Sequence, residues 1–136
     1  MKKISFSEIS KGIKSFDFPE VDFIVGIGKG GIPPAALIAY KLQKSLSVIF
    51  VNYRDDKNEP CRKNALVTGK VRVPAGVKRI LLIDDVGVTG ETFRAVKRLL
   101  GKYKVSTFAL KGFADHVLFP ELHECVIWPW KSINPG

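Results

Sequence analysis

Residues 79–100 read RILLIDDVGVTGETFRAVKRLL, and this stretch decides the fold. Ile80–Ile83 is an uninterrupted apolar run with two β-branched residues, which is typical of a strand buried on both faces. Asp84 and Asp85 end the run, and a turn rich in glycine and threonine follows from Val86 to Thr92. Apolar residues then recur at steps of three and four, which predicts a helix after the turn.

The turn between this strand and this helix has the features of an anion site. The first turn of a helix carries free backbone N–H groups and the positive end of the helix dipole. Gly87 and Gly90 allow the backbone to approach a ligand closely, and Thr89 and Thr92 add hydroxyl donors. The two preceding carboxylates suit neutral hydroxyls or a divalent metal better than they suit a phosphate. The stretch therefore predicts a ribose 5-phosphate site rather than an ordinary strand, turn and helix.

A second strand, glycine loop and helix precede the first unit in the chain. Phe23–Ile27 reads as a buried strand, and Gly28–Gly31 as a glycine loop that carries one cation, Lys29. Ala35–Leu42 reads as an apolar helix, and the two prolines before it suit a first helical turn. Considered alone, this loop fits a tight turn with a solvated lysine as well as it fits a phosphate site. In the same short α/β chain as the first unit, it predicts a second phosphate site, because successive glycine N–H groups can converge on one anion.

The pattern Asp-Asp-x-x-x-Thr-Gly-x-Thr at residues 84–92 resembles the phosphoribosyl pyrophosphate (PRPP) signature of the type I phosphoribosyltransferases. The resemblance runs from about Val21 to Trp130 and is closest to the members that use xanthine, guanine and hypoxanthine. It implies an α/β fold with a doubly wound, mostly parallel sheet flanked by helices and a small flexible hood. It also implies transfer of the 5-phosphoribosyl group from PRPP to a purine base in purine salvage, with release of pyrophosphate.

The resemblance assigns a role to each motif. Asp84 and Asp85 are the expected catalytic residues, which bind the ribose hydroxyls, and Asp85 is the expected ligand of Mg²⁺. The 5-phosphate is expected at Val86, Gly87, Val88, Thr89, Gly90, Glu91 and Thr92. The pyrophosphate is expected at Lys29, Gly30 and Gly31. The base is expected at Lys111, Cys125, Val126 and Trp128. Related enzymes usually carry arginine at the position of Lys29, and lysine keeps the charge without the bidentate fork.

Two positions depart from the oxopurine pattern. Val88 stands where those members commonly carry an aspartate that handles the proton on purine N7, and valine cannot exchange a proton. Cys125 stands where the bacterial xanthine–guanine enzymes stack an aromatic ring on the purine, and Trp128 replaces that ring only if the tail shifts its register. For Trp128 and Trp130, a place in the core or at an interface is as well supported as a place against the base. The alternative function is therefore a catalytically weak or inactive regulatory protein that binds PRPP or a nucleotide. A third is a hydrolase or a transferase to a non-nucleobase amine.

The 136 residues are expected to form a single domain, with the hood at about 54–72 and the base-binding tail at about 111–136. Arg62 and Lys63 are the cations expected in the hood. Ser5 and Glu8 have the spacing of a capping box and predict a first helix, and Gly101 is expected to cap the helix that follows residue 90. Further strands are expected at Leu46–Tyr53, Val105–Leu110 and Glu124–Trp130, a short hairpin at Val67–Val71, and irregular structure at Asp115–His123.

The composition limits the partners that are expected. The formal net charge is +9, which attracts polyanions, but the basic residues are spread along the chain without a dense tract, so nucleic acid is an unlikely partner from sequence alone. No apolar stretch reaches the length of a membrane span, and no secretory signal follows the basic start. Two distant cysteines are expected as free thiols in the cytoplasm. A homo-oligomer, dimer or tetramer, is expected from the resemblance.

Overall fold

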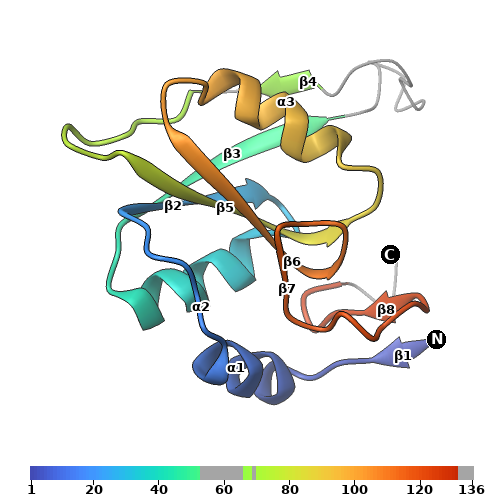
Figure 1. Ribbon diagram of the computed structural model, residues 1–136. Helices are drawn as coiled ribbons and strands as arrows, with labels where there is room; N and C mark the ends of the chain where they lie inside the picture. The colour runs from blue at the N-terminus through green and yellow to red at the C-terminus, as the bar shows by residue number, and fades with distance from the viewer. Residues whose placement is uncertain (53–65, 69, 132–136) are drawn as a thin grey trace.

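The computed structural model describes residues 1–52, 66–68 and 70–131 and shows a central sheet with helices on both faces (Figure 1). The three helices are α1 (Phe6–Ser15), α2 (Ile32–Leu42) and α3 (Glu91–Leu99). The strands are β1 (Lys2–Lys3), β2 (Phe23–Gly28), β3 (Leu46–Asn52), β4 (Leu66–Thr68), β5 (Arg79–Gly87), β6 (Lys104–Gly112), β7 (His116–Val117) and β8 (Val126–Ile127).

The main sheet has six strands in the order β4-β3-β2-β5-β6-β7. Five of them are parallel, and β4 runs antiparallel to β3 at the edge. Figure 1 shows α3 over one face of the sheet, with α1 and α2 over the other. This confirms the predicted doubly wound α/β fold.

The strand order reverses direction between β2 and β5, which are neighbours in the centre of the sheet. From β2 the chain crosses through α2 to β3 on one side, and from β5 it crosses through α3 to β6 on the other. In open parallel sheets such a reversal leaves a crevice at the carboxyl ends of the two strands, where ligands bind. The two loops singled out in the sequence are the loops that follow β2 and β5, so the fold brings them to this crevice.

The core has two parts, one on each face of the sheet. Below the sheet in Figure 1, residues such as Ile9, Ile38 and Leu81 pack between the sheet, α1, α2 and the C-terminal tail. On the other face, Leu82, Phe93 and Val96 belong to the apolar layer beneath α3. Residues of β5 alternate between the two layers, which explains why the strand is apolar at every position from Ile80 to Ile83.

Helix α1 begins and ends at well-defined caps. Ser5 is its N-cap, and Ser5 and Glu8 form the predicted capping box. At the other end, Lys41 of α2 donates from Nζ to the carbonyl oxygens of Ile13 and Phe16 at 2.8 and 2.6 Å. The same ammonium lies 4.9 Å from the centre of the Phe18 ring. Lys41 thus joins α2 to the C-terminal end of α1 by charge-assisted bonds.

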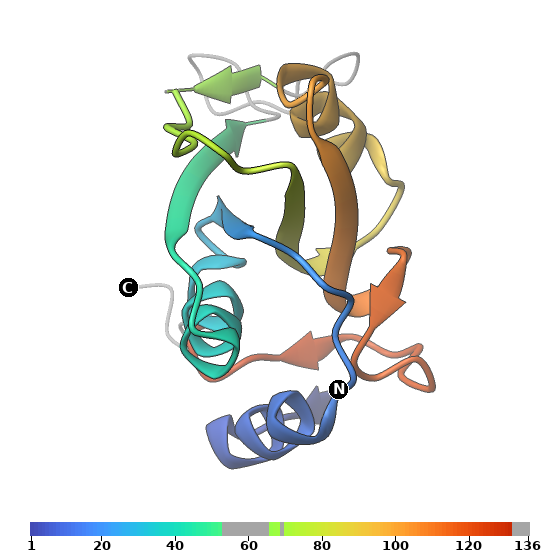
Figure 2. The ribbon, with the colours of Figure 1, turned by 60° about the vertical axis from the view of Figure 1, so that its left-hand side comes forward.

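The C-terminal tail packs under the sheet beside α1, where β8 pairs in parallel with β1 (Figure 2). Trp128 follows β8 and is 1% exposed, stacked between Phe119 and Trp130 at ring distances of 6.5 and 5.8 Å. Phe6 at the start of α1 lies 5.9 Å from the ring of Trp130. The Trp-Pro-Trp segment therefore closes the lower core, which was one of the two interpretations left open by the sequence.

Several predicted boundaries differ from the structure for identifiable reasons. Strand β5 continues to Gly87 instead of ending at the acid pair, because Val86 and Gly87 still pair with Lys111 and Gly112 of β6. The residues at 66–68 form a strand as expected, but it pairs with β3 and not within a local hairpin. Helix α3 is capped by Leu100 rather than by Gly101, and the segment expected to be irregular contains β7, which extends the sheet.

Most of the predicted hood, including Arg62 and Lys63, lies outside the described residues, as does Cys61. Among the helices that are described, none has the length and apolar character needed to cross a membrane.

Replacing Lys41 with methionine is expected to destabilise the fold, because the apolar stem is kept while both bonds to the end of α1 are lost. Two charge-assisted bonds of this kind correspond to a loss of about 2–4 kcal/mol in the free energy of unfolding. Urea denaturation measures this loss. Lys44→Met is the matched control, since the exposed Lys44 side chain forms no hydrogen bond or ion pair within the described part of the chain, and an equal loss in both variants would contradict the capping role.

Candidate functional site

The loop after β2 lies directly against the carboxyl end of β5. A Cβ atom on Gly31 would lie 2.5 Å from the carbonyl oxygen of Ile83, 2.6 Å from that of Ile27 and 3.0 Å from the Cα of Asp84. All three are backbone atoms of the two central strands, so they cannot move aside cheaply. Only glycine allows α2 to start this close to the sheet, and this packing fixes the distance between the two predicted phosphate loops.

Gly30 brings the first loop into contact with the acid pair. A Cβ atom at this position would overlap the carboxylate of Asp85. The peptide bond between Gly28 and Lys29 is cis, and Lys29 itself is exposed. The backbone of the glycine loop thus lies against the carboxylate at the end of β5, and the lysine side chain faces solvent.

The two carboxylates are held by the backbone of the same strand. Asp84 Oδ1 accepts from the N–H of Asp85 at 2.8 Å, and Asp85 Oδ1 accepts from the N–H of Val86 at 2.8 Å. Burial and the neighbouring Asp85 carboxylate raise the pKa of Asp84 to about 8, while the ammonium of Lys131 acts in the opposite direction. A site that keeps two acids side by side favours binding of a cation or of hydroxyl donors.

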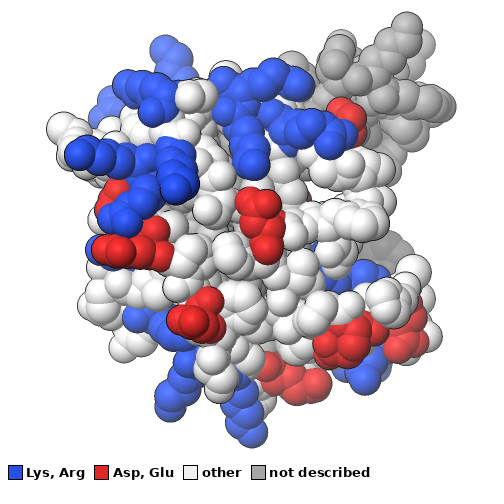
Figure 3. Space-filling model, in the orientation of Figure 1, with Lys and Arg blue, Asp and Glu red and all other residues white. Residues whose placement is uncertain are grey.

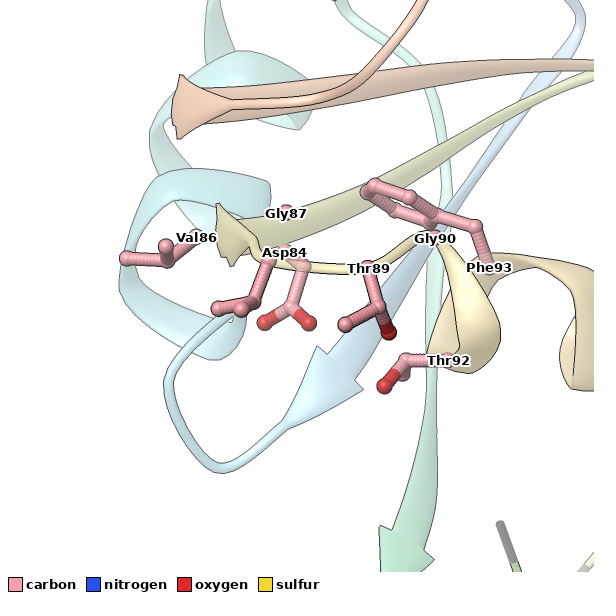
Figure 4. A pocket seen from close by; sticks show the side chains of 8 residues that line it. Asp84, Val86, Gly87, Thr89, Gly90, Thr92 and Phe93 are labelled. Carbon is pink, nitrogen blue, oxygen red and sulfur yellow. The ribbon is translucent and has the colours of Figure 1, made fainter. Parts of the chain in front are cut away.

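The loop after β5 surrounds a cavity of about 140 Å³. It is lined by Asp84, Val86, Gly87, Val88, Thr89, Gly90, Thr92 and Phe93. In Figure 4 the carboxylate of Asp84 and the hydroxyl groups of Thr89 and Thr92 lie on the same side of this loop. Gly90 is the N-cap of α3 with a φ of 80° and has no side chain to cap the helix, while the Thr89 hydroxyl accepts from the N–H of Glu91 at 3.3 Å. The cavity therefore adjoins the amino end of a helix, as expected of a phosphate cradle.

Glu91 is the one residue of the predicted cradle whose side chain is bound to a cation. Its carboxylate accepts from Arg94 at 2.7 Å, and Arg94 also donates to the carbonyl oxygen of Thr89 at 3.4 Å. The ion pair holds the Glu91 carboxylate in the first turn of α3, where its negative charge interacts favourably with the positive end of the helix dipole. Glu91 does not line the cavity: its carboxylate is bound to Arg94, and its N–H donates to the Thr89 hydroxyl at 3.3 Å.

The comparison with protein families agrees with this geometry. The model of the phosphoribosyl transferase domain matches residues 6–116, which include both loops and the acid pair. The chain belongs to this family. A transcriptional regulator, GfcR, of Thermoplasma acidophilum is 43% identical over 75 residues, covering 55% of this chain and 34% of the regulator. The bifunctional protein PyrR of Deinococcus deserti is 34% identical over 79 residues, covering 53% of this chain and 43% of PyrR. The chain spans less than half the length of these two curated relatives.

Solved structures of phosphoribosyltransferases share the fold over nearly the whole chain. A purine phosphoribosyltransferase from Pyrococcus horikoshii matches with a TM-score of 0.75 at 20% identity, covering 98% of this chain and 95% of that one. The xanthine-guanine-hypoxanthine phosphoribosyltransferase of Helicobacter pylori matches with a TM-score of 0.76 at 13% identity, covering 95% and 92%. At these identities the likeness establishes the type I phosphoribosyltransferase fold alone.

The predicted base-binding residues of this phosphoribosyltransferase-family chain are not gathered in the cavity. Lys111 donates from Nζ to the carbonyl oxygen of Glu124, which ties the end of β6 to the tail. Cys125 is an exposed free thiol beside that contact, and Val126 is half-buried against the lower core. Trp128 is buried in that core, so the prediction that its ring stacks on a base does not fit its position here.

Two residues near the site were missed from the sequence. Phe93 lines the cavity although its helical spacing indicated only a core residue. Lys131 acts electrostatically on Asp84 from the end of the tail, about 45 positions later in the chain. No local pattern could have connected Lys131 to the acid pair, because the contact depends on how the tail packs.

Gly31→Ala is expected to destabilise the protein by about 1–3 kcal/mol, because the added methyl group overpacks against backbone of both central strands. Urea denaturation measures the change. Gly101→Ala is the matched control, since its Cβ would meet only the carbonyl oxygen of Arg98 at 3.4 Å. Equal stability of Gly31→Ala and Gly101→Ala would contradict the conclusion that the loop packs against β5 too closely for a side chain at residue 31.

Proposed function

We propose that this protein transfers the 5-phosphoribosyl group from PRPP to a purine base, releasing pyrophosphate, as part of purine salvage in the cytoplasm. The observation that carries the proposal is the contact of Gly30 with the Asp85 carboxylate. This contact joins a glycine loop with a cation, an acid pair and a phosphate cradle in one crevice. PRPP has a pyrophosphate, two ribose hydroxyls and a 5-phosphate in that same order.

Each part of PRPP then has a matching group in the crevice. The carboxylates of Asp84 and Asp85 accept from the ribose hydroxyls, and the hydroxyls of Thr89 and Thr92 donate to the 5-phosphate together with the first turn of α3. The backbone N–H of Gly30 donates to the pyrophosphate, whose charge is balanced in part by Lys29, whereas the N–H of Gly31 donates to the carbonyl oxygen of Ile27 at 2.8 Å and shapes the loop. These roles follow the resemblance and are consistent with the sides of the crevice on which the residues lie.

The donor set also fits Mg²⁺. This ion binds through one or two carboxylates together with waters and substrate phosphates rather than in a cage made by the protein. Within the described part of the chain no cluster of three or more potential ligands exists, but Asp84 and Asp85 place two adjacent carboxyl groups at the end of β5, each oriented by a backbone N–H. We propose that Asp85 holds Mg²⁺. When bound, the ion would neutralise negative charge on the departing pyrophosphate.

The chemistry requires little covalent participation by the protein. The bond from ribose C1′ to the pyrophosphate oxygen breaks, and the electron pair leaves with pyrophosphate. A nitrogen of the base forms the new bond to C1′ and loses its proton. Between these events the sugar has oxocarbenium character, so the residues that bind the ribose and both phosphate groups act by positioning and by electrostatics. Lys111 at the end of β6 is proposed to bind a carbonyl oxygen of the base, in exchange for its bond to Glu124.

Val88 favours a second candidate function. It is 72% exposed at the tip of the cradle loop and cannot take a proton from the base. Asp84 and Asp85 still suit a sugar phosphate, and curated relatives of similar sequence include a transcriptional regulator. The second candidate is therefore a protein of the same fold that binds PRPP or a nucleotide and regulates without turnover. Assembly into a homo-oligomer stays a prediction from the resemblance under either function.

The double variant Asp84→Asn/Asp85→Asn is expected to lose PRPP binding. Removing two charge-assisted contacts to ribose corresponds to a loss of affinity of about a hundredfold or more, measured by titration calorimetry with Mg²⁺ present. Asp17→Asn/Glu121→Gln removes the same charge at exposed positions and is expected to bind PRPP like the unchanged protein. Unchanged affinity in the first variant would contradict the assignment of the site.

Pyrophosphate release separates the two candidate functions. The protein is expected to release pyrophosphate from PRPP and Mg²⁺ with at least one base from a panel of purines and pyrimidines, above the rate with water or ammonia alone. The Asp84→Asn/Asp85→Asn variant serves as the inactive control. Tight PRPP binding with no release for any base would contradict the transferase and support the regulator, whereas release without a base would indicate a hydrolase.

A further inference from the structure

The fold gathers basic residues that are spread along the sequence. Figure 3 shows lysine and arginine side chains over α3 and over the turns beside its C-terminal end. Five residues define what we name the α3 basic surface: Lys78, Lys97, Arg98, Lys102 and Lys104. Lys97 and Arg98 lie in the last turn of α3, and the N–H of Lys104 donates to the carbonyl oxygen of Lys78 at 2.9 Å. Lys78 and Lys102 line one cavity.

The acids near this surface are engaged with other cations. Glu91 pairs with Arg94 at 2.7 Å, and Glu20 and Asp22 pair with Arg79 at 3.4 and 3.1 Å. The Arg79 guanidinium and two backbone N–H groups hold the pKa of Asp22 at about 2, so this carboxylate stays ionised and engaged. Within the described part of the chain, none of the five residues of the α3 basic surface forms an ion pair. Because Glu20 and Asp22 share the single charge of Arg79, the five cations of the α3 basic surface together with this group carry a net charge of about +4.

Helix stability accounts for only part of this cluster. Cations in the last turn favour the negative end of a helix dipole, which explains Lys97 and Arg98. Lys102 and Lys104 follow the helix, and Lys78 precedes β5, so the dipole does not require them. Placing three further lysines beside the same helix end costs electrostatic repulsion that an anionic partner would relieve.

A shallow cavity with an aromatic wall adjoins the lysines. It has a volume of about 470 Å³ and runs between the 73–77 turn and Tyr103, with Lys78 and Lys102 at its sides. The ammonium of Lys102 lies 5.3 Å from the centre of the Tyr103 ring. An aromatic ring flanked by cations is the combination that proteins use to bind single strands, where bases stack and phosphates pair with lysine or arginine.

We propose that the α3 basic surface binds single-stranded nucleic acid, with a base in the Tyr103 cavity and phosphates along Arg98, Lys97 and Lys102. An anionic membrane is the weaker fit. Leu99 is the single large apolar residue exposed within the surface, whereas membrane-binding helices present an apolar face.

This surface is separate from the ligand crevice. The crevice lies at the carboxyl ends of β2 and β5 and at the amino end of α3. The α3 basic surface lies at the opposite end of α3, where β5 and β6 begin. A nucleic acid bound there leaves the sugar-phosphate site open, so the inference does not depend on the proposed function.

The test is fluorescence anisotropy with labelled oligouridylate and oligodeoxythymidylate of about 20 nucleotides, titrated with the full chain from about 50 to about 200 mM salt. The variant Lys97→Gln/Arg98→Gln/Lys102→Gln is expected to weaken binding at least about tenfold. The slope of log affinity against log salt concentration is expected to become shallower by about two units. Lys2→Gln/Lys11→Gln/Lys14→Gln removes the same charge from exposed positions around α1 and is the matched control, expected to change affinity by about twofold or less.

Tyr103→Leu keeps the apolar contact with the core and removes the aromatic ring, and it is expected to weaken binding by about fivefold or more. Circular dichroism and urea denaturation establish that each variant is folded. Equal losses in the two triple variants would overturn the proposal, because the net charge alone would then explain binding. It would also be overturned if vesicles of anionic lipid bound more tightly than either oligonucleotide and lost that binding in the Lys97 variant. A preference for one oligonucleotide identifies the natural strand as RNA or DNA.

Discussion

The close approach of the first glycine loop to the end of β5 is the constraint on which the site depends. Gly31 lets α2 begin against the carbonyl oxygens of Ile27 and Ile83, and Gly30 leaves room for the Asp85 carboxylate. Both contacts lie at the reversal of strand order between β2 and β5. A side chain at Gly31 would press on backbone of both strands and separate the two loops, and one at Gly30 would displace the Asp85 carboxylate.

The acid pair at the carboxyl end of β5 is the second feature on which the site depends. Asp84 and Asp85 are partly buried neighbours that repel one another, and the pKa of Asp84 is raised accordingly. Such a pair lowers stability unless a ligand or cation compensates it. The backbone N–H groups that hold each carboxylate fix its direction, so a cation or a sugar with two hydroxyls can relieve the repulsion without rearranging the pair.

The parts of the fold and of the site that could be predicted are those encoded by neighbours in the sequence. The apolar run at Ile80–Ile83, the capping box at Ser5 and the two loops each depend on a few adjacent residues. The burial of Trp128, the action of Lys131 on Asp84 and the end of β5 at Gly87 depend on partners far away in the chain. The α3 basic surface belongs to this second group, because Lys78 and Lys102 meet only after β5 and β6 pair.

The structure separates the groups that hold a sugar phosphate from the groups that would handle a proton. The acid pair lies on backbone fixed by the sheet, whereas Val88 is an exposed apolar residue on the three-residue tip between β5 and α3, which also carries Thr89 and Gly90. Binding of the ribose therefore depends on the sheet, and proton transfer to residue 88 depends on the side chain at one loop position. A base that gives its proton to water needs no acid at residue 88, while a base that needs a protein acceptor finds none on this loop. Chains with the same crevice can thus differ in turnover without differing in the ligand that they hold.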